Sequence, residues 1–514
     1  MLTSILATCA FWVPQQAEAN MAAGRVFEDK NFNEQYDAGE RGLAGVRVSN
    51  GATVVKTDSE GRYQIPVTDD TIIFVVKPRG YRTKLNDDML PQFYYIHKPN
   101  GSPKLNFKGV TATGALPKSV DFPMYAQKEP EQFHAILFGD PQPRNQTEVD
   151  WIAHDVVEEL VGTKASFGVT LGDIVFDNLD VMQPLNRSIG LIGIPWYNVI
   201  GNHDINYDAR SRKIANETFE RVYGPSYYSF DHGPVHFMVL DNIDWHENAK
   251  GKWTYRGAFG KSQLEWAKND LALVPEDQLV VVFMHVPLTT TGDRASLYRL
   301  IEKRKFCMSV SGHTHYQEHV FIKEKDGWKG KDPHHHVINV TVCGSWWGGA
   351  KDERDIPHTL MADGAPNGYS TISFDGSDYK MEFHAAGRSK NYQVQLHAPE
   401  VVKSTESQKG SLFANVFNGS EKTTVEMKIG KGEWIKMKKV REIDPKYQSI
   451  YDREAAILAK DKTMFRQLTK PKKSGHIWRL NLPQKLPVGT HMITVRATDT
   501  KDRVYWGRRI LRVN

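Results

Sequence analysis

Cysteine is scarce in this sequence of 514 residues. Cys9, Cys307 and Cys343 are the only three, which excludes the disulfide framework that holds many small secreted domains together. Cys307 and Cys343 lie in apolar runs that predict β-strands, so we expect buried thiols there; a bridge between neighbouring strands is the open alternative. Stability must come from hydrophobic cores, and 12 Trp, 20 Tyr and 23 Phe are enough for several.

Long apolar runs are also scarce. Beyond the N-terminus, no stretch is long and apolar enough to span a membrane. At the N-terminus an apolar segment covers residues 2–13, and the small residues of "AEA" end at Ala19. This pattern predicts a signal peptide over residues 1–19, although no basic residue precedes the apolar segment. We therefore expect an exported protein, periplasmic or secreted.

Net charge is only +5, but it is unevenly distributed. Residues 401–514 contain 25 Lys and Arg against 11 Asp and Glu, a net charge of +14. The rest of the chain contains 41 basic and 50 acidic residues, a net charge of −9. The basic C-terminal segment favours an anionic partner, either a surface or a polymer; a solvated lysine-rich face is the alternative.

The chain lacks internal repeats, low-complexity tracts and glycine-rich phosphate-binding loops, but its patterning changes along its length. After the signal peptide, residues 20–127 show short alternating strands and glycine-containing turns, which predict a β-sandwich. Residues 128–392 alternate apolar runs with helical patterns such as "EVDWIAHDVVEELVG" and "GKSQLEWAKNDLALV", which indicates an α/β domain. Residues 393–514 return to strand-like runs and predict a C-terminal β-rich domain.

Five apolar runs of the middle segment end in side chains that bind metals. Because strand C-termini converge on one edge of an α/β sheet, these side chains are expected to meet there. Carboxylate, amide and imidazole groups together suit a divalent cation. A single Asp at a strand end is most often a turn former or helix cap, but five such ends in one segment favour a metal site. The residues at the five ends are Asp140; Asp173; Asn202, His203 and Asp204; His285; and His313 and His315.

The order "GD…GDIVFDN…GNHD…H…GHTH" resembles the calcineurin-like metallophosphoesterases, from residue 133 to about residue 385. The resemblance implies an α/β fold with a four-layer αββα core and two divalent ions (Mn, Fe, Mg or Zn). It implies that Asp173 bridges the ions, that His203 faces the substrate, and that Asp204 orients His203. The implied ligands are Asp140, Gln142, Asp173 and His315 for one ion, and Asp173, Asn202, His285 and His313 for the other.

Gln142 departs from the usual family pattern, which has a histidine two residues after the first aspartate. An amide oxygen is a harder and weaker ligand than imidazole, so it favours Mg²⁺, Mn²⁺ or Fe²⁺ over Zn²⁺. The alternative for Gln142 is a structural hydrogen bond without metal contact. The "FYYIHKPNGSP" and "HIWRLNLP" segments further resemble the N- and C-terminal β-sandwich domains of a three-domain bacterial subgroup of this family.

Two further segments, residues 343–369 and 334–336, contain residue types that are common in functional sites. In the Gly- and Trp-rich segment 343–369, we consider Trp346, Trp347 and Asp363 candidates for the wall of a substrate site; packing between domains is the alternative. The triple histidine at residues 334–336 lies in a polar context that predicts a solvated loop.

The segment "DKNFNEQYDAGE" has the oxygen-ligand spacing of a calcium-binding loop. Glu34 replaces the glycine expected at the sixth position, and the flanks are strands, so an Asx-rich turn is the alternative. The stretch resembles calcium-loop β-sandwich repeats of bacterial surface proteins. The calcium candidates are Asp29, Asn31, Asn33, Asp37 and Glu40.

Taken together, these patterns predict an exported three-domain phosphoesterase that hydrolyses phosphate monoesters or diesters by attack of a metal-bridging hydroxide. Two metals can clamp the attacking and leaving oxygens of a phosphoryl displacement. The substrate would be a phosphorylated small molecule or polymer. One alternative is a nuclease that uses the basic C-terminal domain, with a steep salt dependence. The other is a cell-surface binding module with a vestigial metal site.

Overall fold

The computed structural model describes residues 20–514; the predicted signal peptide and Cys9 lie outside this range. The N-terminal part contains two main sheets and a short strand pair, which pack their apolar faces together. One sheet has the order β2-β1-β11-β7 with β5 paired to β1, and the other has the order β10-β6-β3-β4. The strands are β1 Asn20–Glu28, β2 Arg41–Gly42, β3 Arg47–Ser49, β4 Val54–Lys56, β5 Arg62–Val67, β6 Thr71–Val75, β7 Tyr81–Arg82, β8 Lys84–Leu85, β9 Pro91–Gln92, β10 Tyr94–His97 and β11 Phe122–Ala126.

The middle part contains two larger mixed sheets. The first has the order β14-β13-β12-β23-β24, and the second has the order β15-β16-β19-β20-β22-β21. The central strands β13 and β19 are buried along their whole length, as expected for strands with both faces covered. The strands are β12 Gln132–Phe138, β13 Phe167–Thr170, β14 Trp196–Asn198, β15 Tyr228–His232, β16 Val235–Val239, β19 Leu279–Phe283, β20 Cys307–Ser311, β21 Glu318–Ile322, β22 His334–Ile338, β23 Gly368–Asp375 and β24 Asp378–Ala385, with a hairpin β17 Ile243–Glu247 and β18 Trp253–Gly257.

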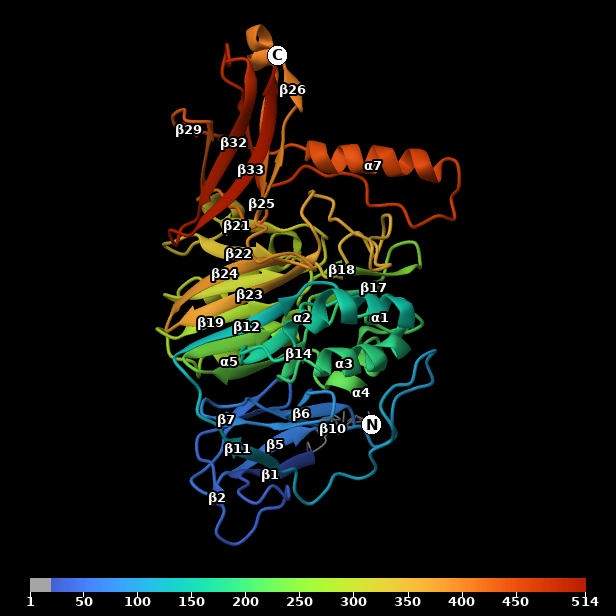
Figure 1. The fold of residues 1–514 in the computed structure, drawn as a ribbon. Coiled ribbons are helices and arrows are strands. Elements are labelled where there is room, and N and C mark those ends of the chain that lie inside the picture. The colour runs from blue at the N-terminus through green and yellow to red at the C-terminus, as the bar shows by residue number, and fades with distance from the viewer. Residues whose placement is uncertain (1–19) are drawn as a thin grey trace, which may run out of the picture.

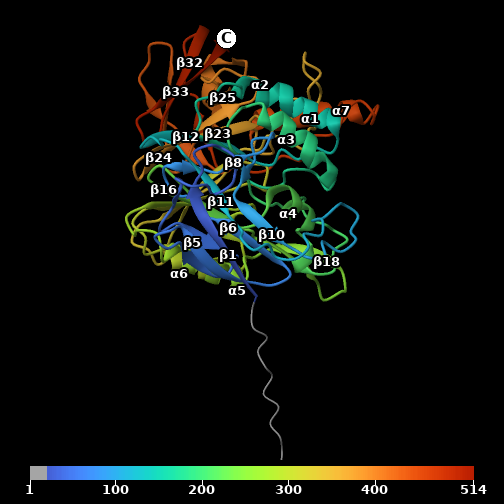
Figure 2. The same cartoon turned by 90° about the horizontal axis from the view of Figure 1, so that it is seen from below.

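Helices cover the outer faces of both middle sheets, which gives the four-layer αββα arrangement. Figure 2 shows α1 and α3 on one side of the sheets and α5 and α6 on the other. Ile136 and Phe138 of β12 belong to the same buried cluster as Val149 and Ile152 of α1. The helices are α1 Gln146–Ile152, α2 Glu158–Leu160, α3 Met182–Gly190, α4 Glu217–Tyr223, α5 Lys261–Leu271 and α6 Arg294–Ile301, with a π-helical turn Ala153–Val157 joining α1 to α2 and 3₁₀ turns at Leu179–Val181, Arg212–Ile214, Leu288–Thr290 and Glu324–Asp326.

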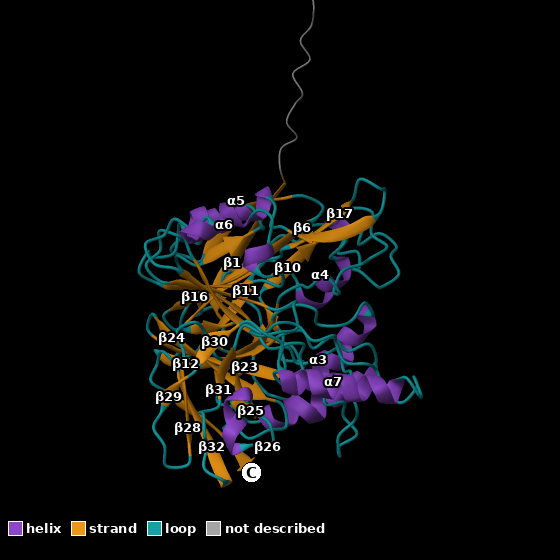
Figure 3. Cartoon of the chain, turned by 90° about the horizontal axis from the view of Figure 1, so that it is seen from above, coloured by secondary structure: helices purple, strands orange, loops and turns teal. Residues whose placement is uncertain are grey.

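Two further sheets form the C-terminal part, at the end of the molecule opposite the N-terminal sheets (Figure 1). Helix α7 Pro445–Leu458 stands apart from them, on the side of the molecule where α3 lies (Figure 3). Among residues 20–514, no helix has the length and apolarity to cross a membrane. The strands are β25 Val394–His397, β26 Val401–Val402, β27 Ser411–Val416, β28 Thr424–Ile429, β29 Ile435–Lys436, β30 Lys438–Val440, β31 Ile477–Asn481, β32 Gly489–Thr498 and β33 Val504–Val513, with a 3₁₀ turn at Ser404–Lys409. We propose domain boundaries after residues 127 and 392.

A buried charge cluster joins the N-terminal part to the middle part. The Arg47 guanidinium contacts Asp231 at 2.6 Å and Asp270 at 3.1 Å. His236 lies between the same two carboxylates, at 2.7 Å and 3.1 Å. Beside this cluster, Trp266 of α5 donates its indole N–H to the Ser49 hydroxyl at 3.0 Å. The two parts therefore share one continuous core.

The triple histidine corrects one sequence prediction. Residues 334–336 form the start of strand β22 and not a loop, and His334 and His336 are buried. Ser309 contacts both imidazoles at 2.8 Å. Cys307 and Cys343 are both free thiols, so the alternative of a bridge between them does not apply.

We expect Arg47→Met to lower the free energy of unfolding by about 3 kcal/mol, because removal of one partner leaves buried Asp231 and Asp270 uncompensated. The measurement is the midpoint of thermal unfolding, compared with the matched control Arg62→Met, whose side chain is exposed on β5. Equal midpoints for the two variants would show that the cluster does not hold the two parts together.

Candidate metal centre

The predicted ligands lie just after five strands whose ends meet. β12, β13 and β14 run parallel in one sheet, and β19 and β20 run parallel in the other. Asp140, Asp173 and Asn202 follow the first three strands, and His285 and His313 follow the other two. The ends of the two sheets are joined by a bridge between Gly139 and Thr341. Candidate ligands from both sheets therefore lie at one edge of the double sheet.

Asp173, Asn202, His285 and His313 form one compact group. Nε2 of His285 lies 3.1 Å from Oδ1 of Asp173 and 3.2 Å from Oδ1 of Asn202. It also lies 3.1 Å from Nδ1 of His313. The other ring nitrogen of His285 contacts the Leu171 carbonyl at 2.8 Å, which fixes the ring with Nε2 toward the group. Asp173, His285 and His313 satisfy the distances for holding one ion together.

Asp140, Gln142, Asp173 and His315 form a second group around the same Asp173. Nε2 of His315 lies 3.4 Å from Oδ2 of Asp140, and its Nδ1 contacts the Gly344 carbonyl at 2.6 Å. The Gln142 amide donates Nε2–H to Oδ2 of Asp173 at 2.8 Å. Gln142 thus has the structural hydrogen bond of the alternative interpretation, and metal binding by Gln142 stays a prediction.

The donor set fits two divalent cations. Asp140 and Asp173 are 0% and 2% exposed, and buried carboxylates need compensating positive charge.

Three glycines beside the candidate ligands have no side chain, and the candidate ligands fill the space that a side chain would need. A Cβ at Gly201 would lie 1.9 Å from the Asp173 backbone nitrogen, one at Gly312 would lie 2.3 Å from Oδ1 of Asp140, and one at Gly172 would lie 2.4 Å from Nδ1 of His285.

Strained backbone is concentrated at the same residues. Five predicted ligands have left-handed φ angles, a conformation that costs energy for residues with a side chain. Such strain persists only where the surrounding structure enforces it, which is typical of functional sites. The five are Asp140 (35°), Gln142 (42°), Asp173 (49°), His313 (77°) and His315 (53°).

The charged groups of the first cluster shift one another's pKa values. Burial opposes ionisation of both partners, but the contact between Asp173 and His285 outweighs it. The pKa of Asp173 is held well below its usual range, and the pKa of His285 is raised to about 9. Burial and the neighbouring His285 lower the pKa of His313 to about 4. The Asp173 carboxylate is therefore ionised, as a metal ligand must be.

The structure corrects the role expected for Asp204. His203 Nδ1 contacts Asp177 at 2.6 Å, and its ring stacks on Phe176 with centroids 4.5 Å apart. Asp204 instead accepts backbone N–H groups of Ile174, Val175 and Gly201 at 2.8–3.1 Å. Asp177 therefore orients His203, and Asp204 braces the loops that hold Asp173 and Asn202.

Of the three candidates for the substrate wall, Trp346 alone lies against a predicted ligand. Its ring stacks on His315 with centroids 4.0 Å apart. Trp347 is buried, and its indole N–H donates to the Pro141 carbonyl at 3.1 Å. Asp363 contacts His476 at 2.9 Å and thereby joins the middle part to the C-terminal part. Trp347 and Asp363 are therefore packing residues, which corrects the prediction.

The oxygen atoms of the expected calcium loop are bonded mainly within the loop. Asp29 accepts the backbone N–H groups of Phe32 and Glu34 at 2.7 Å and 2.9 Å. Asp37 accepts the side-chain amides of Asn31 and Asn33 at 2.9 Å and 2.7 Å. Such bonds are those of an Asx-rich turn, and calcium binding here stays a prediction.

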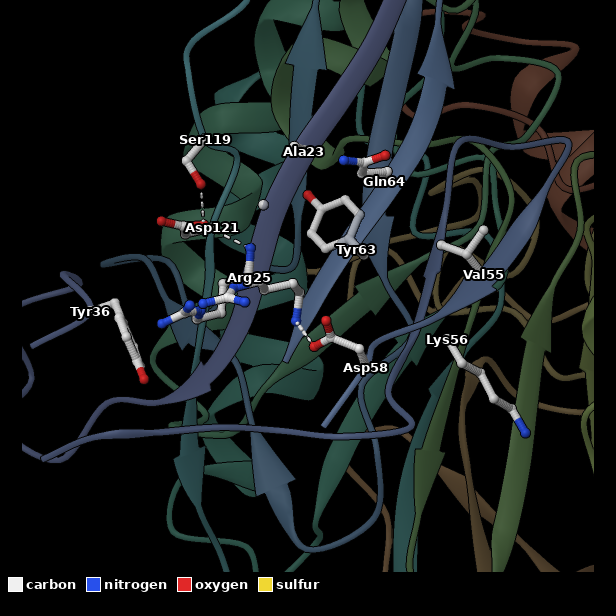
Figure 4. Close-up of a pocket in the computed structure, with 12 residues that line it drawn as sticks. Ala23, Arg25, Tyr36, Val55, Lys56, Asp58, Tyr63, Gln64, Ser119 and Asp121 are labelled. Atoms are coloured by element: carbon white, nitrogen blue, oxygen red, sulfur yellow. Dashed lines mark hydrogen bonds between the residues drawn. The ribbon is translucent and has the colours of Figure 1, made fainter. Parts of the chain in front are cut away.

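A cavity of about 770 Å³ lies in the N-terminal part, beside β1 (Figure 4). Arg25 lies over the Tyr36 ring at 3.8 Å, and its backbone N–H donates to Asp121 at 2.7 Å. Asp58 accepts the backbone N–H of Arg62 at 2.8 Å. The cavity contains none of the predicted metal ligands, so it is separate from the metal centre.

Sequence reasoning missed several residues around the centre. Asp177 is part of "GDIVFDN", four residues after Asp173, and this motif was the available signal. Arg144 lies over the Phe176 ring at 4.1 Å and donates to the Trp346 carbonyl at 3.2 Å. The Cys343 thiol lies 3.6 Å from both Oε1 of Gln142 and Nδ1 of His315. Cys343 is about 200 positions from Gln142 and about 30 positions from His315, and no sequence pattern indicates either contact.

Comparisons with known proteins identify the family of the chain. Residues 134–317 match the family model for calcineurin-like phosphoesterase. Residues 30–111 match the model for the N terminal of calcineurin-like phosphoesterase, and residues 336–505 match the model for its C terminal. The chain therefore belongs to the calcineurin-like phosphoesterases that have both additional domains. Comparison with curated protein sequences gives no match.

Two solved structures are similar to parts of the chain. One is a purple acid phosphatase from seeds of yellow lupin (Lupinus luteus), with 13% identity and a TM-score of 0.37 over 66% of this chain and 66% of that one, just under two thirds of its length. The other is CopC from Methylosinus trichosporium OB3b, with 11% identity and a TM-score of 0.14 over 23% of this chain and 89% of that one.

We expect Gly312→Ala to weaken metal binding about tenfold or more, because the new methyl group displaces the Asp140 carboxylate, and such displacements of ligand supports cost that much. Calorimetric titration with Mn²⁺ measures the effect. Gly292→Ala is the matched control, because its nearest atom is 3.4 Å from the added Cβ. Equal affinities in the two variants would mean that Asp140 does not hold metal.

Proposed function

We propose that the chain is a metal-dependent phosphoric ester hydrolase that acts on phosphate monoesters or diesters, as a phosphatase or a phosphodiesterase. The observation that carries the proposal is the convergence of seven candidate ligand side chains, six of them around Asp173. One ion would be held by Asp140, Gln142, Asp173 and His315, and the other by Asp173, Asn202, His285 and His313. Mn²⁺, Fe²⁺, Mg²⁺ or Zn²⁺ suits these donors.

When bound, two such cations polarise a phosphoryl oxygen and make water nucleophilic at neutral pH. The protein itself contributes side chains that are held in fixed positions. The Asp173 carboxylate accepts the backbone N–H of His203 and the side-chain amide of Gln142. The carbonyls of Leu171 and Gly344 hold the imidazoles of His285 and His315, so little reorganisation is needed during the reaction. Trp346 covers His315 and limits access of water to that side of the centre.

His203 is suited to protonate the leaving oxygen. Its Nδ1 is held by Asp177, and its Nε2 lies 4.0 Å from Oδ2 of Asp173, toward the ligands. Burial lowers the pKa of His203, but the carboxylates of Asp173 and Asp177 outweigh it and raise that pKa overall. The two carboxylates therefore favour the protonated imidazole, which is the form that a general acid requires.

We also propose that the enzyme acts outside the cytoplasm, in a periplasm or as a secreted protein. The support is the apolar segment at residues 2–13 followed by the small residues that end at Ala19. Mass spectrometry of the N-terminus of protein recovered from the cell envelope and medium tests this proposal.

The function is tested by turnover of the metal-loaded protein on a chromogenic phosphomonoester and a chromogenic phosphodiester. We expect Mn²⁺-dependent release of the chromophore from at least one of them. Single-stranded DNA is a third substrate, because a nuclease would cleave it in preference to both. A protein that binds two ions and turns over none of the three would instead be a binding module.

For Asp177→Asn, we expect kcat to fall about 10- to 100-fold, within the range that a positioned general acid contributes. Loss of the carboxylate lowers the pKa of His203, so the decline of activity with rising pH begins at a lower pH. The fall in kcat should be smallest for substrates with good leaving groups, because these need little help from a general acid. Asp180→Asn, an exposed aspartate three residues after Asp177 in the 3₁₀ turn Leu179–Val181, is the control. An unchanged pH profile would exclude His203 as the acid.

Gln142→His is expected to shift metal preference toward Zn²⁺, because imidazole is a softer donor than an amide oxygen. Parallel titrations of metal-free protein with Zn²⁺ and Mn²⁺ measure the affinity ratio. Because imidazole must be neutral to bind, affinity should also become more dependent on pH. An unchanged ratio would indicate that Gln142 does not contact metal.

A further inference from the structure

One face of the C-terminal five-stranded sheet is uncovered. Side chains of β32 and β33 alternate between two faces, and Ile493, Val495 and Leu511 fill the core at 0% exposure. The opposite face, which we call the outer face, comprises Lys428, Met492, Arg496, Trp506, Arg508 and Ile510 with their neighbours on β28, β32 and β33. The sheet stands at the end of the molecule farthest from the N-terminal sheets (Figure 1).

Large apolar side chains are exposed on the outer face. Ile510 is 59% exposed, Trp506 49% and Met492 42%. Met492 is directly opposite Ile510 across the strand pair, so the two form one apolar spot. Val504, 41% exposed, lies two residues from Trp506 on the same strand. A cluster of exposed apolar groups in one place marks an interaction surface.

Free cations surround these apolar groups. Lys428, Lys436, Arg508 and Arg512 form no ion pair among the residues that the structure describes. The nearby acid Glu426 is already bonded to Arg496 at 2.8 Å. The outer face is therefore basic as well as apolar, and it contributes to the net charge of +14 in residues 401–514.

The aromatic groups do not form an open stacking platform. Arg496 lies over the Trp434 ring at 4.3 Å, and Lys428 lies over it at 4.9 Å. Trp506 meets the same ring at 6.1 Å and a tilt of 53°. Bases of single-stranded nucleic acid need exposed ring faces to stack on, and Trp434 is already occupied by cations.

We infer that the outer face docks on an anionic lipid membrane surface. Exposed Ile, Met, Val and Trp side chains gain by entering the boundary between headgroups and acyl chains, whereas they offer nothing to phosphates or sugar hydroxyls. Lys and Arg beside them attract an anionic headgroup layer. Basic and apolar side chains occur together on the outer face. An anionic lipid surface offers negative headgroups to the basic side chains and acyl chains to the apolar ones. The inference is independent of the proposed catalytic function.

Sedimentation of the full chain with lipid vesicles tests the inference. Vesicles of neutral phosphatidylcholine are compared with vesicles in which about a third of the lipid is anionic phosphatidylglycerol. We expect binding to the anionic vesicles, weakening with added salt over the range in which surface charge is screened. Equal binding to neutral and anionic vesicles would overturn the inference, because such binding would not depend on the basic side chains of the outer face.

Variants locate the binding on the outer face. Lys428→Glu with Arg508→Glu, and separately Trp506→Ser with Ile510→Ser, should each reduce binding to anionic vesicles about tenfold or more. The matched controls are Lys250→Glu with Lys331→Glu, and Leu191→Ser, whose side chain is 68% exposed on the middle part. Circular dichroism verifies that all variants are folded.

Two results would contradict the assignment. One is full vesicle binding by both outer-face variants. The other is a stronger affinity of the full chain for single-stranded DNA or an acidic polysaccharide than for anionic vesicles, lost in the same variants, which would assign the face to a polymer.

Discussion

The burial of two carboxylates, Asp140 and Asp173, at the ends of neighbouring strands is the constraint on which the rest of the site depends. An uncompensated buried charge costs several kcal/mol, so the fold must bring positive charge to this edge. His285 supplies part of it at 3.1 Å from Asp173, and bound cations would supply the rest. The strained φ angles of Asp140 and Asp173, and the glycines beside them, are consequences of placing both carboxylates there.

Segments far apart in the chain hold this arrangement in place. The backbone N–H of Cys343 donates to the Asp140 carbonyl at 3.1 Å, and the Gly344 carbonyl orients His315. The segment after Gly344 is in turn fixed by the C-terminal part, where Glu454 of α7 contacts His358 at 2.6 Å. Contacts between packed side chains and loops therefore connect α7 to the candidate metal centre.

The fold, and the strand ends at which the candidate ligands lie, could be predicted because both follow from local patterns. Apolar runs that end in Asp, Asn or His predict strand ends, and Asp140, Asp173, Asn202, His285 and His313 do come together. The sequence predictions that the structure corrects concern side chains whose roles depend on the direction in which the side chain points. Asp204 is next to His203 in sequence and Asp177 is 26 residues away, yet it is the Asp177 carboxylate that contacts the His203 ring. His334, Trp347 and Asp363 are buried by partners more than 20 residues away, which spacing does not reveal.

The central claim is that Asp173 is shared between two metal sites, and the number of ions bound per chain tests it most directly. Metal-free protein would be titrated with Mn²⁺ by calorimetry, with bound metal counted by elemental analysis. The account predicts two ions for the parent chain, weakening of both sites in Asp173→Asn, and weakening of one site in His285→Ala. Loss of a single ion in Asp173→Asn, with the second site unchanged, would contradict it.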